Sequence, residues 1–145
     1  MEWVKRLYGS VVAVDTSPFI YYIEKSAKYL AVIDPFFEAL DRGHIQSVTS
    51  TLTLAETLVH PLRSGDTALV SQYYAILTGA QSVTMLPVSE AIAAKAAELR
   101  SSLGLRTPDA VQIATGITAG ATAFLTNDER LASAKGINII ILDRC

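Results

Sequence analysis

Four acidic residues in this sequence could together hold a divalent metal ion: Asp15, Glu56, Asp109 and Asp128. Magnesium and manganese are hard cations whose preferred ligands are carboxylate and water oxygens, so such a site needs no histidine. If the four acids converge, a bound cation also removes the repulsion between their charges. One or two such ions can activate a water molecule and stabilise the leaving oxygen of a phosphodiester. The carboxylates therefore predict metal-dependent phosphodiester hydrolysis without a nucleophile from the protein.

Two of these acids have simpler explanations when each is considered alone. Asp128 can cap the short helix expected through Arg130 and Leu131. Asp109 can interact favourably with the dipole of a helix that begins just before it. Only their combination with the other acids favours a role at a metal site.

The other two acids are harder to explain as parts of a scaffold. Asp15 ends an apolar run, where an unpaired charge is costly to bury. Glu56 has Leu52 and Val59 as neighbours on one helical face, so the spacing predicts an acid that projects from an apolar stripe. Because a buried acid needs a partner, Glu56 is the most informative of the four.

The counts of cysteine and histidine exclude thiolate metal sites and disfavour zinc. The chain has one cysteine, Cys145, and two histidines, His44 and His60. Neither a disulfide framework nor a thiolate zinc site can be built from them. A metal site must therefore use oxygen ligands, which favours magnesium, manganese or calcium.

Short apolar runs rich in β-branched residues alternate with longer helical patterns along the chain. They predict five buried strands: Val11–Val14, Ile45–Thr49, Val83–Leu86, Ala123–Thr126 and Ile137–Leu142. Strands without polar alternation, separated by helices, are typical of a parallel sheet covered on both faces. We therefore expect residues 1–145 to form a single domain, a three-layer α/β/α sandwich around a five-stranded parallel sheet.

Capping residues and prolines predict where several helices begin. Three pairs have this form: Ser17-Pro18, Asp34-Pro35 and Thr107-Pro108. Each places a capping side chain before a proline at the first helical position. A further helix is expected over residues 91–100, between Ser89 and Gly104. Two others, over 52–60 and 67–77, are separated by a break at 61–65.

The predicted elements bring the acids toward one edge of the sheet. Asp15 and Asp128 directly follow the first and fourth strands, and ligands of open parallel sheets bind at the carboxyl ends of the strands. Asp109 lies in the first turn of a helix, and Glu56 lies in the helix after the second strand. We therefore expect a carboxylate cluster at this edge.

Composition and charge exclude several other classes of protein. The chain is 50% hydrophobic and 18% charged, which excludes a disordered or fibrous protein. Its apolar runs are too short to span a bilayer and its N-terminus lacks a secretory signal pattern, so we expect a cytoplasmic protein. The net charge of −2 gives no sign of a nucleic-acid binder, although four of the acids belong to the proposed site. The basic residues are scattered without a run.

The acids and their surroundings resemble the PIN-domain ribonucleases, in particular the VapC-type toxins of toxin–antitoxin pairs. The matching segments are Val14-Asp15-Thr16-Ser17, Leu54-Ala55-Glu56, Thr107-Pro108-Asp109-Ala110 and Leu125-Thr126-Asn127-Asp128. Their order and separations fit this family over residues 11–142.

The resemblance implies a fold, an activity and a set of site residues. It implies the α/β/α sandwich predicted above and metal-dependent endonucleolytic cleavage of RNA with Mg²⁺ or Mn²⁺. It also implies that the four acids form the metal-binding quartet, and that Ser17 and Thr126 are hydroxyl residues that support it. Toxin members commonly form homodimers and are inhibited by a cognate antitoxin, so both partners are expected here.

One position departs from the family pattern. Many members carry another acid three residues after the position of Asp128, where this chain has Leu131. A second metal ion would therefore have fewer ligands here. One-metal catalysis with Asp15 and Asp109, and a variable contribution from Asp128, remains open.

Other residues near these segments have plainer explanations. Arg63, Arg106 and Arg130 could contact phosphate, but a solvated surface arginine is the simpler interpretation of each. Tyr21 and Tyr22 could stack on bases, but aromatic residues of a first helix more often belong to the core.

Three other functions fit the sequence less well than a nuclease does. A non-catalytic RNA- or protein-binding module could keep the fold, but it would have no need for Glu56. A phospho-acceptor domain would need paired acids near the first strand, which offers only Asp15. A phosphatase for small esters would need a second aspartate two residues later, where this chain has Ser17.

Overall fold

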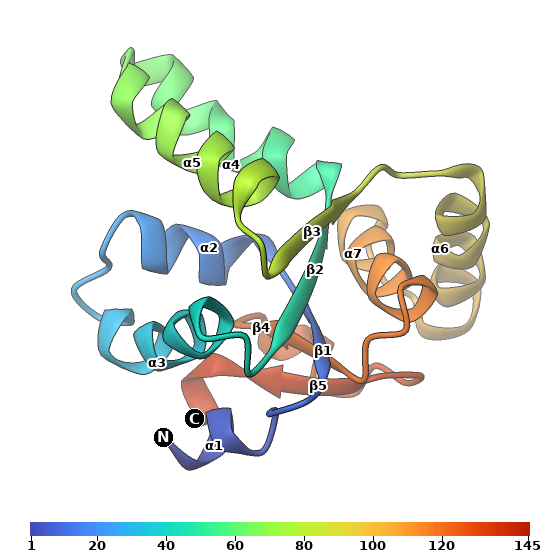
Figure 1. Ribbon diagram of the computed structural model, residues 1–145. Coiled ribbons are helices and arrows are strands. Elements are labelled where there is room, and N and C mark those ends of the chain that lie inside the picture. The colour runs from blue at the N-terminus through green and yellow to red at the C-terminus, as the bar shows by residue number, and fades with distance from the viewer.

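A five-stranded, all-parallel sheet forms the centre of the structure, a computed structural model that describes residues 1–145 (Figure 1). Its strands are β1 (Val11–Val14), β2 (Gln46–Ser50), β3 (Val83–Leu86), β4 (Ala123–Thr126) and β5 (Asn138–Ile141). They are arranged in the order β3-β2-β1-β4-β5, and every neighbouring pair is parallel. The predicted number and orientation of the strands are confirmed.

Seven helices and two short 3₁₀ segments connect the strands. The helices are α1 (Glu2–Lys5), α2 (Thr16–Ile23), α3 (Leu30–Asp41), α4 (Thr51–Ser64), α5 (Thr67–Gly79), α6 (Glu90–Leu103) and α7 (Thr107–Thr118). The 3₁₀ segments are η1 (Glu129–Leu131) and η2 (Leu142–Arg144). None of these helices has both the length and the apolar character needed to cross a membrane.

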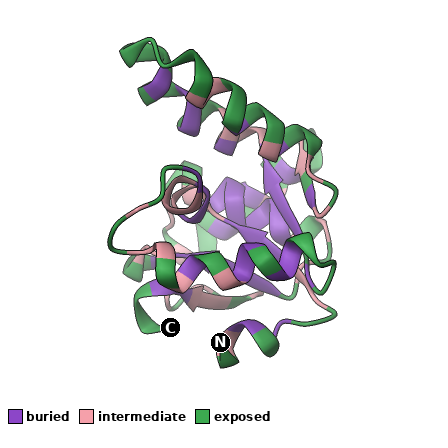
Figure 2. Ribbon diagram, turned by 60° about the vertical axis from the view of Figure 1, so that its left-hand side comes forward, coloured by how far each residue is buried: buried purple, intermediate pink, exposed green.

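The sheet separates two hydrophobic cores, which makes the molecule a three-layer α/β/α sandwich. On one face, Val12 and Val14 pack with residues of α1 to α5, such as Phe36 and Tyr73. On the other face, Ala13 packs with residues of α6 and α7. Figure 2 shows this burial in the strands and on the inner sides of the helices. The opposite orientation of successive strand residues explains the division.

The strand order reverses direction between β1 and β4, so the connections that follow these two strands run to opposite sides of the sheet. The chain leaves β1 toward β2 and β3 on one side of the sheet and returns to β4 and β5 on the other. β1 and β4 are hydrogen-bonded neighbours. In open parallel sheets the crevice at such a reversal, outside the carboxyl ends of the strands, is the usual place for a ligand.

Two helices begin one or two residues before their predicted starts. The cap of α2 is Asp15 rather than Ser17, because its carboxylate accepts the backbone N–H of Thr16. Pro18 is therefore the third helical residue, which a helix tolerates because its first N–H groups have no intrahelical partner. The cap of α7 is Arg106 rather than Thr107.

Two prolines that were expected to mark helix boundaries lie inside helices. α3 begins at Leu30, so the prediction that it starts at Asp34-Pro35 is wrong. The completely buried Ile33 and Phe36 hold its early turns in the core. The expected break over 61–65 is also wrong, since α4 includes Pro61 and ends at Gly65.

α7 packs very closely against the central strand. A Cβ atom added to Gly116 would lie 2.6 Å from the Cβ of Ala13 on β1. Glycine at this position therefore sets the distance between α7 and β1. Because Asp109 lies on α7 and Asp15 follows β1, the contact also fixes the spacing of two of the predicted site residues.

Candidate functional site

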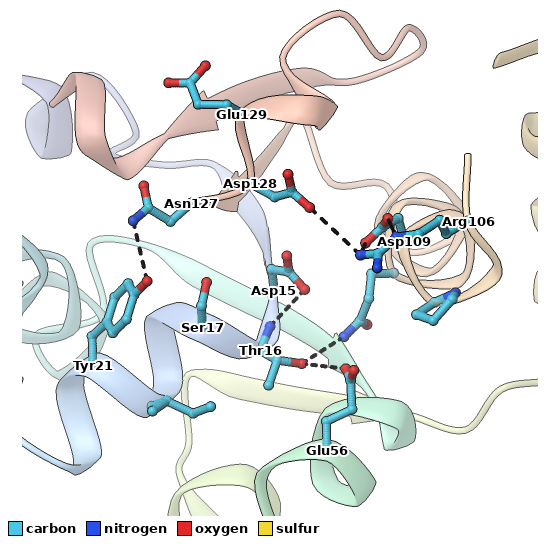
Figure 3. Close-up of a pocket in the computed structure, with 13 residues that line it drawn as sticks. Asp15, Thr16, Ser17, Tyr21, Glu56, Arg106, Asp109, Asn127, Asp128 and Glu129 are labelled. Atoms are coloured by element: carbon cyan, nitrogen blue, oxygen red, sulfur yellow. Dashed lines mark hydrogen bonds and ion pairs between the residues drawn. The ribbon is translucent and has the colours of Figure 1, made fainter. Parts of the chain in front are cut away.

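A polar cleft of about 540 Å³ opens at the carboxyl edge of β1 and β4 (Figure 3). All four predicted carboxylates line it, together with a fifth acid, Glu129. The cleft contains a single basic residue, Arg106. Segments far apart in the sequence therefore bring acidic side chains to one place, as their positions after strands and at helix starts predicted.

Asp15 lies at the centre of this group. Its carboxylate caps α2 by accepting the N–H of Thr16 at 2.8 Å, and it accepts the hydroxyl of Thr126 at 2.8 Å. Burial raises the pKa of Asp15 above its usual value, while these two hydrogen bonds lower it and the charges of Asp109 and Glu56 raise it again. A cation in the cleft would favour the charged form of this carboxylate.

Glu56 enters the cleft from α4 but is not buried. Thr16 Oγ1 donates a hydrogen bond to Glu56 Oε1 at 2.7 Å. The expectation that Glu56 projects from a buried apolar stripe is wrong, because Glu56 and Val59 are both exposed. α4 instead buries Thr53 and Thr57 against the rest of the molecule. Glu56 therefore faces the cleft on the solvent side of its helix.

A buried polar network explains why α4 has this orientation. Gln112 of α7 is 3% exposed and donates to Thr53 Oγ1 at 2.7 Å. Its amide oxygen accepts the hydroxyl of Ser50 at 2.8 Å. Thr53 also pairs with Thr49 at 2.8 Å. Since buried polar groups require partners, this network fixes α4 and α7 at the end of β2.

Asp109 forms an ion pair at the start of α7. Arg106 Nε lies 3.0 Å from Asp109 Oδ2, and Arg106 Nη2 lies 3.9 Å from Asp128 Oδ2. One guanidinium therefore connects two carboxylates that approach the cleft from different elements.

Asp128 has a second cationic partner. Its side chain caps η1 by accepting the N–H of Arg130 at 3.0 Å, and it also accepts Arg130 Nε at 2.9 Å. The hydrogen bond from the Arg130 side chain lowers the pKa of Asp128. The capping role considered for Asp128 from sequence is thus present together with its position in the cleft.

The two hydroxyl residues that are expected to support the acids, Ser17 and Thr126, differ in what they contact. Thr126 is completely buried and links two acids, since its hydroxyl donates to Asp15 and accepts the N–H of Asp128 at 3.1 Å. Ser17 lines the cleft with its hydroxyl directed into it (Figure 3). Leu131, which stands where many family members have an acid, is buried in the core.

The donor set fits a hard divalent cation in its chemistry. Carboxylates and hydroxyls are the ligands and hydrogen-bonding partners that magnesium and manganese use. As the side chains lie, however, no three histidine, cysteine, aspartate or glutamate residues come together closely enough to hold one ion. Arginines form ion pairs with two of the acids, Asp109 and Asp128. Binding of a cation by these two residues requires those pairs to open.

Sequence reasoning missed some residues of the site or left them without a role, among them Thr16, Gln112, Arg106 and Glu129. Thr16 lies between Asp15 and Ser17 in the segment that resembles the family, so its position there could have indicated a role. Gln112 gave a signal, since an amide within the apolar face of α7 needs buried partners. The pair of Arg106 with Asp109 could have been found from its spacing of three residues at the start of one helix. The approach of Arg106 to Asp128 could not, because it depends on the packing of two separate elements.

A family model described as PIN domain matches residues 12–137. No curated protein matches the chain.

Several solved structures of toxin–antitoxin proteins share this fold. VapBC2 from Rickettsia felis, bound to a promoter DNA fragment, has a TM-score of 0.72 at 17% identity, covering 90% of this chain and 98% of that chain. VapC20 from Mycobacterium tuberculosis, described as a Sarcin-Ricin loop cleaving toxin, has a TM-score of 0.68 at 19% identity, covering 88% and 97%. VapBC-5 from the same organism has a TM-score of 0.59 at 26% identity, covering 91% and 98%.

Proposed function

Since the chain belongs to the PIN-domain family, we propose that it is a metal-dependent endoribonuclease and the toxin of a toxin–antitoxin pair. The observation that carries this proposal is the arrival of Asp15, Glu56, Asp109 and Asp128 in one cleft at the carboxyl ends of β1 and β4. A scaffold gains nothing from placing these negative charges together, because they repel one another. Residues 1–145 would act as one nuclease unit.

The four acids would hold Mg²⁺ or Mn²⁺ in this site. Such an ion, when bound, supplies an activated water and stabilises the negative charge that develops on the phosphate. Asp15 would provide a ligand whose position is fixed by Thr126 and Thr16. Thr16 would orient Glu56 in the same way. The neutral hydroxyls thus hold the carboxylates in place without competing with them for the cation.

RNA is the proposed substrate because of the resemblance and the known relatives. VapC20, which shares the fold, is described as cleaving the sarcin–ricin loop. The cleft of this chain is open to solvent and polar, which suits a flexible strand better than a small apolar ligand. We also propose that the protein acts in the cytoplasm, because RNA and a cognate antitoxin would be present there.

An antitoxin and a second copy of the chain are the proposed protein partners. The similar chains from Rickettsia felis and Klebsiella pneumoniae were solved in toxin–antitoxin complexes. The proposal that this chain forms a homodimer rests on the family resemblance alone. The molecular mass of the purified protein in solution tests whether it is a dimer.

The central experiment is RNA cleavage with and without a divalent metal. The purified chain is incubated with a pool of structured RNAs in Mn²⁺ or Mg²⁺, and then with excess chelator. Asp109→Asn is assayed in parallel, because it removes a carboxylate charge with little change in volume. Asp34→Asn, at an exposed position on α3, is the matched control.

The proposal expects discrete fragments with metal, none with chelator, none with Asp109→Asn, and unchanged fragments with Asp34→Asn. Circular dichroism must show that both variants remain folded. If the wild-type chain binds neither Mn²⁺ nor Mg²⁺, the metal-dependent mechanism is wrong. A non-catalytic RNA- or protein-binding module is then the better assignment.

A further inference from the structure

Arg106 is the only cation among the side chains that line the cleft. Five carboxylates share the cleft with it: Asp15, Glu56, Asp109, Asp128 and Glu129. An RNA phosphate that enters this space meets a strong excess of negative charge. A bound divalent cation offsets part of that charge, but a positively charged side chain is needed to attract and orient the phosphate.

The position of Arg106 allows its guanidinium to move. Its side chain is 59% exposed, whereas the side chains of its partners Asp109 and Asp128 are 13% and 23% exposed. The arginine is therefore the more exposed member of each pair, and its guanidinium has more room to change position than the carboxylates have. Figure 3 shows the guanidinium between these two acids at the side of the cleft.

The ion pair is poorly explained as a device that stabilises α7. Arg106 is the N-cap of the helix and makes no side-chain capping hydrogen bond. A cation at a helix N-terminus lies at the unfavourable end of the helix dipole. Exposed ion pairs contribute little to stability in any case. The placement of this arginine therefore calls for another explanation.

Arg130 does not offer the same possibility. It contacts Asp128 through both its backbone N–H and its side chain, and it is not among the residues that line the cleft. Its guanidinium thus pairs with Asp128 without lining the cleft. Arg106 remains as the basic residue that can reach a ligand in the cleft.

We propose that Arg106 is the phosphate-binding residue of this cleft, and that a divalent cation releases it by taking over the oxygens of Asp109 and Asp128. This inference rests on the proposed nuclease function. The cation and the guanidinium compete for the same carboxylate oxygens, because Arg106 lies 3.0 Å from Asp109 Oδ2 and 3.9 Å from Asp128 Oδ2. Once free, a guanidinium can form two parallel hydrogen bonds to a phosphate. The exchange couples metal binding to RNA binding.

The competition is measured first, in the absence of RNA. Isothermal titration calorimetry gives the affinity of the full chain for Mn²⁺ in the wild type, Arg106→Gln and Arg42→Gln. Arg42, the C-cap of α3, pairs with Glu38 at 2.7 Å, so the control removes one similarly exposed positive charge away from the cleft. We expect Arg106→Gln to bind Mn²⁺ about 2- to 5-fold more tightly, which is the effect of losing one partly exposed ion pair that competes with the metal. Arg42→Gln should bind Mn²⁺ as the wild type does.

The phosphate contact is measured next, by RNA cleavage at saturating Mn²⁺. We expect Arg106→Gln to raise the KM for RNA by about 10-fold, a loss of the order of one charged hydrogen bond. Its kcat should change less than its KM. Arg42→Gln should leave both constants unchanged.

The two measurements separate this inference from the nuclease proposal. Unchanged or weaker Mn²⁺ affinity in Arg106→Gln overturns the competition. Tighter Mn²⁺ binding with an unchanged KM overturns the phosphate contact. A wild-type chain that binds Mn²⁺ but cleaves no RNA contradicts the nuclease activity, and with it the role of Arg106 toward RNA, whereas the Mn²⁺ affinities still decide the competition.

Discussion

Thr16 Oγ1 donates a hydrogen bond of 2.7 Å to Glu56 Oε1, joining the first turn of α2 to α4 across the cleft. Thr16 also follows Asp15 and gives its backbone N–H to that carboxylate. One residue therefore positions two acids that come from different parts of the chain. This relationship, together with the other contacts of the site, leads to four predictions.

The first prediction concerns the coupling of Thr16 and Glu56. Thr16→Val removes the hydroxyl but keeps the shape of the side chain, so we expect kcat for RNA cleavage to fall about fivefold, equivalent to one hydrogen bond of about 1 kcal/mol. Thr16→Ser, which keeps the hydroxyl, should retain most of the activity.

A double-mutant cycle checks that the effect passes through Glu56. If Thr16 acts by orienting Glu56, the loss in Thr16→Val should disappear in a Glu56→Gln background. Simple additivity of the two substitutions would show that Thr16 acts on another group. The measurement is kcat at saturating Mn²⁺ for all four combinations.

The second prediction concerns Thr126, which lies between Asp15 and Asp128. Thr126→Val removes a buried hydroxyl that bonds to both residues. We expect the free energy of unfolding to fall by about 1–2 kcal/mol, because the N–H of Asp128 loses its partner. Affinity for Mn²⁺ should also fall, since Asp15 is held less firmly. Urea unfolding measures the change in stability, and calorimetry measures the affinity for Mn²⁺. Thr126→Ser keeps the hydroxyl and should retain most of the wild-type stability and affinity. Full metal affinity in Thr126→Val would contradict the positioning role.

The third prediction uses the buried carboxylate of Asp15. Burial raises the pKa of Asp15, so the native state binds its proton more tightly than the unfolded chain does. The free energy of unfolding therefore falls as pH rises from the usual pKa of an aspartate to the raised pKa of Asp15. Above the raised pKa, Asp15 is ionised in the native state and destabilises it by a constant amount. In chelator near neutral pH, Asp15→Asn should therefore be more stable than the wild type.

The pH dependence provides the test for Asp15. The difference in the free energy of unfolding between Asp15→Asn and the wild type should shrink as pH falls toward about 4, where aspartates become protonated. Urea unfolding at a series of pH values in chelator measures this difference. A variant that is less stable than the wild type at every pH would show that the carboxylate is not strained by burial.

The fourth prediction concerns the close approach of α7 and β1. Gly116→Ala would place a Cβ 2.6 Å from that of Ala13, so the helix must move away from the strand. We expect the free energy of unfolding to fall by about 1–3 kcal/mol, the usual cost of overpacking a core. Cleavage should also fall, because Asp109 moves with α7 relative to Asp15.

Gly79→Ala is the matched control for this substitution. Gly79 ends α5 with nothing within 4 Å of an added Cβ, so its replacement should leave stability unchanged or raise it by up to about 1 kcal/mol. Thermal unfolding of both variants provides the measurement. Equal stabilities of the two variants would contradict the steric explanation.

Local patterns in the sequence were sufficient to predict most of the secondary structure. The strands β1, β3 and β4 have the predicted bounds, and β2 differs by one residue at each end. α6 has the predicted cap at Ser89 and ends at Gly104 in the left-handed conformation. These features depend on hydrogen bonds and backbone conformations within a few residues, which is why the sequence shows them directly.

Predictions about helix boundaries failed where packing overrides local preference. Pro35 and Pro61 suggest helix boundaries because proline lacks an N–H group, yet both lie inside helices. The burial of Ile33 and Phe36 beside Pro35 explains the continuation of α3. A proline costs a helix one hydrogen bond, and a large apolar contact surface can offset that loss.

The sequence by itself determined which acids lie at the carboxyl edge of the sheet, because the end of a strand or the start of a helix fixes each position along the chain. Only the tertiary structure decided what those acids contact. Glu56 is exposed because the buried Thr53 and Gln112 set the rotation of α4, and Arg106 reaches Asp128 because α7 packs beside β4. Contacts between distant segments depend on the packing of whole elements, whereas a sequence pattern reports only on near neighbours.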